Sequence, residues 1–471
     1  MSKRTMGRRA FMKASAALGA GWTASRGWTA LSYSRVAGAN ERMNLAVIGV
    51  GGRARRNLDL LAGRQRSRYG ARRVDARVPA AYRGDEYAER VTGTHIAALC
   101  DVNMARAGDA FDAYPEAVKH VDYRRMLDEM DGDIDAVVVS TSDHSHAPAS
   151  VTAMRMGKPV FCEKPGAQSV REARVMAEVA KEQGVATQLC IQGNALDNIR
   201  RIVELIRSGA IGEVSAFHIW ERTGARSIEI PTESRPEPDS LHWDLWLGPA
   251  PWRPYHPHYI PRGRGWQLMW DFAGGQLTNM GCHLFNWGFR ALELQYPSTV
   301  EAEGSELPHP RTVPPRLHVR YAFERGDGKA PVTLTWTHGD EPRAVFAEHE
   351  LPDWAWTSEQ MVFVGDKGML LANWDRHMLW PEDEFEGYEP PEPSIPPSVG
   401  HYLEWIQACR GEGEALCHFG YSMPITEAVL LGNVAYRSGR KLQWNAEQFT
   451  IDNAHEAEGF LQRDYRPGWT L

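Results

Sequence analysis

Residues 43–54 read MNLAVIGVGGRA, and this stretch decides the fold. The mostly apolar run Met43–Ile48 predicts a short buried strand, and the three leucines soon after it predict a helix. Between them, Gly49 permits a tight turn, Gly51 lets the backbone approach a pyrophosphate, and the small Ala54 lets the helix pack on the strand. The amino end of such a helix attracts phosphate. The predicted dinucleotide-binding residues of this turn are Gly49, Gly51, Gly52, Arg53 and Ala54.

A second apolar segment, residues 95–100, ends at the acidic residue Asp101. A carboxylate at this place accepts hydrogen bonds from the ribose hydroxyls of NAD and repels the 2′-phosphate of NADP, so we expect NAD rather than NADP. Along the chain, the separation between the glycine motif and Asp101 is longer than the usual ~20 residues. Residues 64–90, which contain eight arginines, account for the excess as a surface insertion. We interpret these arginines as part of the solvent-exposed surface. The alternative is that they contact an acidic partner or the phosphate of the cofactor.

The strand–helix alternation continues, with apolar strands expected at 134–139 and 159–162. Polar residues follow both strands, in the segments Ser140–His146 and Glu163–Pro165. Because the carboxyl ends of parallel strands share one edge of a sheet, these residues should gather beside the glycine turn. The fold class predicted for residues 40–165 is therefore α/β, a doubly wound parallel sheet. The further cofactor-binding candidates are Thr141, His144, His146, Glu163 and Lys164.

Residues 166–471 have a different pattern and predict a second, α+β domain. Strands at 317–323 and 332–336 alternate between apolar and polar residues, which favours an open, mostly antiparallel sheet with one solvent-exposed face. Helices near 401–410 and 425–437 close the fold. We expect this sheet to mediate a homo-oligomer.

The stretch 242–275 is read as a long loop, and six of the 17 tryptophans fall between Trp243 and Trp287. Aromatic faces stack on the C–H faces of sugars, and long ordered loops are usually functional. The alternative is that these aromatic residues pack in the core or between subunits. No acidic or cysteine partner lies near His256 and His258 at ligand spacing, so no metal is predicted. The candidate substrate residues of this loop are Trp252, Tyr255, His256, Tyr259 and Trp266.

The glycine turn, the Ser140–His146 segment and the Glu163–Pro165 triplet together resemble the Gfo/Idh/MocA oxidoreductases. Downstream, Gly274–His283 resembles that family's second signature, GG followed by D-x-G-x-H. The segments 439–442 and 465–469 resemble its exported bacterial branch, and the resemblance covers about residues 42–470. It implies a Rossmann domain followed by an open antiparallel sheet flanked by helices, a nicotinamide cofactor, and sugar-like substrates.

The resemblance also implies a catalytic set. Hydride transfer from a sugar carbon needs a base for the hydroxyl proton and a donor for the developing alkoxide. Lys164 matches the position that lies against the reacting hydroxyl, and His283 matches the second catalytic position. Asn279 stands where the family commonly has Asp. Asn cannot stabilise an imidazolium by charge, which would favour neutral His283. Without the resemblance, the first two would be read as a surface lysine and a packed histidine.

The first 39 residues are predicted to be a twin-arginine export signal. Arg8-Arg9 is followed by a weakly apolar, Ala- and Gly-rich segment, and Ala37–Ala39 supplies an A-x-A cleavage site. A basic, disordered arm is the alternative. The mature chain would begin near Asn40 and reside in the periplasm or outside the cytoplasm.

Composition excludes several classes of protein. A net charge of −7 argues against a nucleic-acid partner, because phosphate neutralisation needs a basic face. No run of 18 apolar residues follows position 40, which argues against a membrane-spanning helix. Six cysteines without short paired spacing predict neither a disulfide framework nor a zinc site.

The function expected first is an NAD-dependent oxidoreductase acting on a sugar, polyol or glycoside. A periplasm holds no dependable pool of NAD, so an exported enzyme would have to retain its cofactor. That constraint raises a second reading, a redox-neutral NAD-dependent glycosidase. It would oxidise the sugar transiently, eliminate the leaving group, add water and return the hydride. The third reading, from another class, is a sugar-binding protein with a structural cofactor.

Overall fold

The computed structural model describes residues 42–63, 91–224, 226–261, 265–326, 328–339, 351 and 360–471. The predicted export signal at 1–39 and the arginine-rich insertion at 64–90 lie outside the described residues. Within the described ranges, no helix has both the length and the apolar character needed to cross a bilayer.

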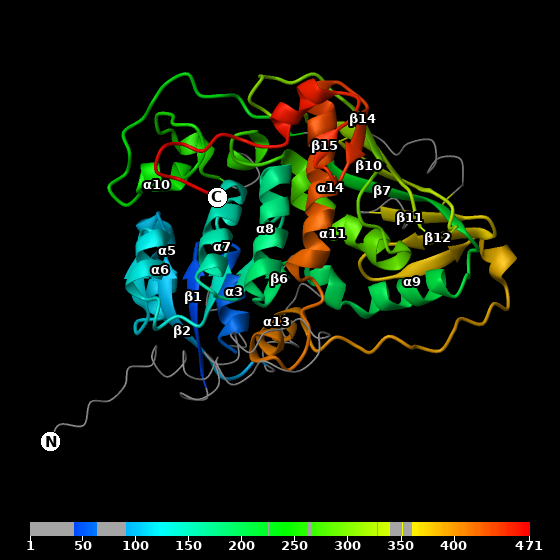
Figure 1. Cartoon of the computed structure of the whole chain (residues 1–471), viewed down its shortest axis with the longest axis horizontal. Helices are drawn as coiled ribbons and strands as arrows, with labels where there is room; N and C mark the ends of the chain where they lie inside the picture. The colour runs from blue at the N-terminus through cyan, green and yellow to red at the C-terminus, as the bar shows by residue number, and fades with distance from the viewer. Residues whose placement is uncertain are drawn as a thin grey trace.

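The amino-terminal sheet has six parallel strands in the order β3-β2-β1-β4-β5-β6 (Figure 1). The strand order reverses at β1, which pairs with β2 on one side and β4 on the other, and ligands bind at this switch point in doubly wound sheets. The predicted α/β fold is thus confirmed. The sheet extends past residue 165, because β6 pairs with β5. The strands are β1 (Met43–Ile48), β2 (Thr94–Cys100), β3 (Val118–His120), β4 (Ala136–Val139), β5 (Val160–Cys162) and β6 (Thr187–Leu189).

Helices cover both faces of this sheet. Ala46 and Ile48 of β1 pack in the core beneath α6, α7 and α8, whereas Leu45 and Val47 pack on the opposite side with α3, α5 and α13. A strand that is buried on both faces has a nearly continuous apolar sequence, and this pattern allowed β1 to be predicted. These helices are α3 (Ala54–Leu61), α5 (Met104–Ala113), α6 (Tyr123–Glu129), α7 (His146–Arg155), α8 (Val170–Gln183) and α13 (His401–Arg410).

The second domain is built on a nine-stranded sheet in the order β13-β12-β11-β7-β10-β9-β8-β14-β15. Its pairs are antiparallel except for β7 with β10. In β9, Val319 and Tyr321 are buried and alternate with half-buried His318 and exposed Arg320, so one face is apolar and the other polar. The strands are β7 (Val214–Gly224), β8 (Thr299–Gly304), β9 (Leu317–Phe323), β10 (Val332–Gly339), β11 (Gln360–Gly365), β12 (Gly368–Ala372), β13 (His377–Trp380), β14 (Leu442–Asn445) and β15 (Thr450–Ile451).

Helices α11 (Gly275–Leu292) and α14 (Phe419–Ser438) pack on the apolar face of this sheet, and α9 (Asp197–Arg207) packs against α11. Figure 1 shows α11 and α14 between the two sheets, with α8 beside α14. The apolar core is therefore continuous from the first domain into the second. The short helix α10 (Trp243–Leu247) stands apart, above α5 and α7 (Figure 1).

All six cysteines are buried and free. Burial raises the pKa of the Cys282 thiol to about 12, and it raises the pKa of Cys417 to about 12 as well. Buried thiols with raised pKa values stay protonated and are poor nucleophiles. The cysteines are Cys100, Cys162, Cys190, Cys282, Cys409 and Cys417.

Candidate active site

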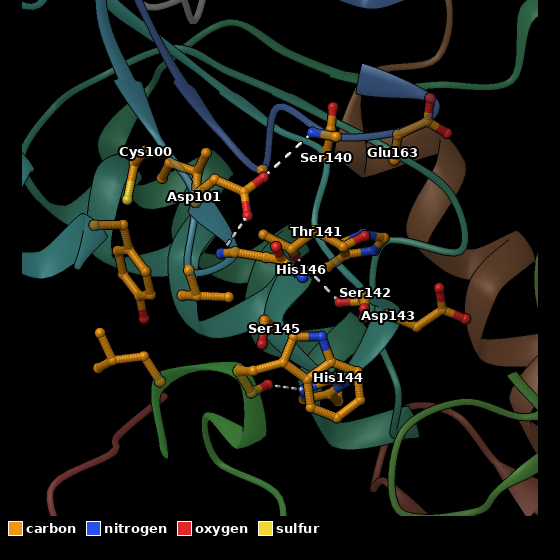
Figure 2. Close-up of a pocket in the computed structure, with 18 of the residues that line it drawn as sticks. Cys100, Asp101, Ser140, Thr141, Ser142, Asp143, His144, Ser145, His146 and Glu163 are labelled. Carbon is orange, nitrogen blue, oxygen red and sulfur yellow. Dashed lines mark hydrogen bonds between the residues drawn. The ribbon is translucent and has the colours of Figure 1, made fainter. Parts of the chain in front are cut away.

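A pocket lies where the strands of the first sheet end. Its walls come from the segments that follow β1, β2, β4 and β5, as the sequence predicts, and Figure 2 shows Asp101 and the Ser140–His146 segment around it. Gly52 and Ala54 are not among the lining residues. The predicted cofactor residues that line the pocket are Gly49, Gly51, Arg53, Asp101, Thr141, His144, His146, Glu163 and Lys164.

The glycine turn is shaped for close approach. Gly49 has a φ of +81°, and a Cβ there would lie 2.7 Å from the carbonyl oxygen of Ser140 and 2.9 Å from the nitrogen of Thr141. Helix α3 begins at Ala54, which is fully buried, and among the described residues no side-chain capping hydrogen bond is found at its amino end. An uncapped helix start behind a glycine turn fits the pyrophosphate of a dinucleotide.

Asp101 ties the end of β2 to this turn. Its Oδ2 accepts hydrogen bonds from the backbone N–H of Val50 at 2.9 Å and of Gly51 at 3.2 Å, and its Oδ1 accepts from Asn103 N–H at 2.8 Å. Burial is the largest influence on this carboxyl and raises its pKa, against the lowering effect of these bonds and of Arg106.

Arg106 is a pocket residue that sequence reasoning missed. It lies against the turn, since a Cβ on Gly51 would come within 2.8 Å of its Cγ. Arginine near the ribose is the residue type that accommodates the 2′-phosphate of NADP. Asp101 alone therefore does not decide between NAD and NADP, and the preference for NAD stays a prediction.

His144 and His146 are buried and hold the wall after β4. The Nε2 of His144 lies 2.9 Å from the carbonyl oxygen of Trp246, and the ring packs against Trp246 and Phe272. The Nε2 of His146 lies 3.1 Å from the carbonyl oxygen of Thr141. Burial lowers the pKa of His144 to about 3 and of His146 to about 4, so both rings are neutral at pH 7. His144 thus links the first domain to the α10 segment.

Glu163 is anchored beside the pocket. Its Oε1 accepts hydrogen bonds from Arg53 Nε at 3.2 Å and from Asn57 Nδ2 at 3.0 Å. The Oδ1 of Asn57 in turn accepts from the Tyr402 hydroxyl at 2.9 Å. This chain of bonds fixes the backbone immediately before Lys164. Asn57 and Tyr402 gave no sequence signal, because one looks like an ordinary helix residue and the other comes from α13, far along the chain.

Lys164, Asn279 and His283 meet where the two domains join. The side chain of Lys164 is 8% exposed, and its Nζ donates to the backbone oxygen of Asn279 at 2.6 Å and to its Oδ1 at 2.9 Å. His283 lies one turn further along α11 and therefore on the same face as Asn279. Burial is the largest influence on His283 and holds its pKa well below the usual value. The charge of Lys164 is the second influence and acts in the same direction. A neutral imidazole and an ammonium therefore lie near each other at the domain junction, and Lys164 itself lines the pocket.

The aromatic loop is largely a packed cluster. Of the predicted substrate residues, Trp266 lines the pocket, whereas Tyr255 and Tyr259 are buried against Trp243. Trp252 is 65% exposed and lies outside the pocket lining.

His256 does not line the pocket either, and its Nδ1 accepts from the backbone N–H of His258. Trp246 and Gln267, which were not predicted as site residues, do line the pocket. Gln267 Nε2 lies 3.4 Å from Asn279 Oδ1. Aromatic content alone could not separate the packed residues from those at the site.

Comparison with known families finds a match in each domain. Residues 43–190 match the model described as "Oxidoreductase family, NAD-binding Rossmann fold", and residues 198–330 match "Oxidoreductase family, C-terminal alpha/beta domain". The first domain is accordingly an NAD-binding Rossmann domain.

Individual relatives match over shorter stretches. Inositol 2-dehydrogenase of Salmonella typhimurium is 30% identical over 166 residues, which is 34% of this chain and 49% of that enzyme. The 1,5-anhydro-D-fructose reductase of Ensifer adhaerens is 47% identical over 92 residues, 19% of this chain and 27% of that enzyme. The chain thus spans about half, or less, of the length of these curated relatives.

Solved structures agree in fold over most of the chain. The WlbA dehydrogenase from Bordetella pertussis, in complex with NADH and UDP-GlcNAcA, has a TM-score of 0.56 at 15% identity, covering 86% of this chain and 99% of that one. The aldose-aldose oxidoreductase from Caulobacter crescentus, complexed with glycerol, has a TM-score of 0.53 at 17% identity, covering 85% and 99%. At such identities the likeness shows the fold alone.

Proposed function

This chain belongs to the Gfo/Idh/MocA oxidoreductase family, and from that premise we propose that it transfers a hydride between tightly held NAD and a hydroxyl-bearing carbon of a sugar, polyol or glycoside. The observation that carries the proposal is Lys164, a pocket-lining ammonium bonded to Asn279 of the second domain and close to neutral His283. Relatives named for inositol and anhydrofructose support a polyhydroxylated substrate.

We assign a separate role in the hydride transfer to each residue of the site. NAD, when bound, supplies the hydride acceptor. Removing hydride from a carbinol also releases the hydroxyl proton, which needs a base that is unprotonated at the working pH. We propose His283 as that base, because burial and the nearby Lys164 charge keep its ring unprotonated. The same influences weaken it as a base, so its proton uptake must be coupled to hydride transfer. The ammonium of Lys164 stabilises the developing negative charge on the substrate oxygen. Gln267 and Trp266 line the same pocket and are proposed to contact the sugar.

The experiment supplies a panel of sugars, polyols and aryl glycosides to the NAD-loaded protein without an external acceptor. We expect reduced nicotinamide to rise to one equivalent per site and then stop, because the acceptor is missing. Absorbance of the reduced cofactor measures this directly.

Other outcomes point to the other functions. Continuous release of aglycone with no net reduction would replace this proposal by the redox-neutral glycosidase. Deuterium from deuterated water would then enter the sugar at the carbon next to the transient ketone. Sugar binding without either signal, unchanged in Lys164→Ala and His283→Ala, would leave a sugar-binding protein with a structural cofactor.

We also propose that the chain is exported by the twin-arginine route, on the basis of Arg8-Arg9 and Ala37–Ala39. Replacing both arginines by lysine keeps the charge and removes the recognised pair. The double variant should accumulate in the cytoplasm as an uncleaved precursor, which fractionation followed by mass spectrometry would detect. Equal periplasmic amounts of the double variant and the wild type would contradict the assignment.

A further inference from the structure

The segment Leu461–Leu471, called the strap below, crosses from the second domain to the first. Leu461 is buried in the main core beside η8 (His455–Phe460). At the other end, Trp469 lines the cofactor pocket. Figure 1 shows the strap in red, running from the side of α14 and β14 across to α10 and α7. A segment without helix or strand thus reaches the pocket from the far domain.

The middle of the strap is fixed to a buried carboxylate. Glu172 of α8 is 1% exposed, and its Oε1 accepts from Arg463 Nε at 2.7 Å and from the Tyr465 hydroxyl at 2.6 Å. Arg463 also donates to the backbone oxygen of His144 at 2.5 Å. A charge-assisted pair that is this deeply buried is costly to break by removing one partner. The strap is therefore held in one path, next to the pocket wall.

A second set of bonds joins the strap to the α10 segment. Arg466 donates through Nε to the backbone oxygen of Gly248 at 2.8 Å and through its terminal nitrogens to the Oδ1 and backbone oxygen of Asp244, both at 2.6 Å. Leu245 and Trp246 of α10 line the pocket. The strap consequently fixes a pocket wall as well as contributing a side chain.

Trp469 lies at the end of the pocket formed by the start of α6. The guanidinium of Arg124 is 4.1 Å from its ring centroid and donates to the backbone oxygen of Gly468 at 3.0 Å. The Tyr123 ring is 6.2 Å away. Asp122 and Tyr123 line the pocket together with Asp101, the residue expected beside the ribose.

We propose that the strap is part of the dinucleotide site: Trp469 covers the adenosine end of the pocket, and the bonds of Arg463 and Arg466 keep the cover and the α10 wall in place. This proposal rests on the proposed function, since it assumes that NAD occupies the pocket. An aromatic side chain against a nucleobase adds contact and excludes water. Release of the cofactor would require the strap or α10 to move, so the strap should act mainly on the dissociation rate.

The test compares Trp469→Ala with Thr470→Ala, the exposed neighbour of Trp469 on the same strap. Each protein is loaded with isotope-labelled NAD and passed through gel filtration, and the released cofactor is quantified by mass spectrometry. Displacement by excess unlabelled NAD gives the dissociation rate. We expect Trp469→Ala to release NAD ~10-fold or more faster than the wild type, in line with the loss of one aromatic–base contact. Thr470→Ala should match the wild type, and Trp469→Phe should restore most of the retention.

Two further observations separate the possible failures. Arg466→Ala leaves Trp469 intact but releases α10, and it should also speed dissociation, which keeps the test open if Trp469→Ala folds poorly. Wild-type protein that cannot be loaded with NAD would refute the proposed function. Loadable wild type with unchanged dissociation in both Trp469→Ala and Arg466→Ala would overturn the strap proposal alone.

Discussion

Lys164→Met should lower kcat about 30- to 1,000-fold, or ~2–4 kcal/mol of barrier, while NAD content stays near wild type. Methionine keeps the length of the side chain but removes the ammonium that bonds to Asn279 and lines the pocket. Because the substituted group stabilises charge that develops during the reaction, the loss should fall on kcat rather than on KM. Single-turnover reduction of bound NAD by an active sugar is the measurement.

Lys158→Met is the matched control. Lys158 is also a buried lysine, but it lies two residues before β5, whereas Lys164 lies two residues after it. It is therefore at the opposite edge of the sheet, where its Nζ donates to the backbone oxygen of Ile134 at 2.8 Å. The control should lose stability and keep the kcat of the folded, NAD-loaded enzyme. An equal loss of kcat in both variants would remove Lys164 from the catalytic set.

Gly49→Ala should abolish NAD retention and destabilise the protein by ~2–4 kcal/mol. An L residue at a φ of +81° is strained, and the new Cβ would overlap the backbone of Ser140, which cannot swing aside as a side chain can. Bound NAD and the denaturant midpoint are measured on the same preparation. Gly108→Ala, in α5 with open space at its Cβ, is the control and should be neutral or stabilising by ~0.5–1 kcal/mol. Normal NAD content in Gly49→Ala would disprove the role given to the turn.

The part of the site that could be predicted from sequence is the part carried by local pattern. Gly49, Asp101 and Ser140–His146 each follow an apolar strand directly, and Lys164 comes two residues after another. The edge where they gather therefore follows from the parallel sheet. Helix α11 was not predicted, because its Gly281 and Gly288 are poor helix formers. Those glycines are needed for packing: a Cβ at Gly288 would lie 2.5 Å from Phe217. Tertiary packing therefore overrides propensity in this helix.

The remainder of the site depends on contacts between distant segments. Tyr402 reaches Asn57 and Arg463 reaches Glu172 across hundreds of residues, and no periodicity in the sequence records such pairs. Which residues of the aromatic loop line the pocket could not be predicted for a different reason. Tyr259 and Trp266 are both aromatic and both pack in the same buried cluster, yet only Trp266 also lines the pocket. Only the path of the backbone distinguishes them.

The six buried thiols have a practical consequence for studying the strap. Because all six are enclosed and protonated, the folded chain presents no accessible native thiol to a maleimide or a nitroxide reagent. A cysteine introduced at the exposed Thr470 would then be the single site that takes a label under native conditions. A spectroscopic probe there would report whether the strap moves when NAD binds or dissociates, with no native cysteine having to be replaced first.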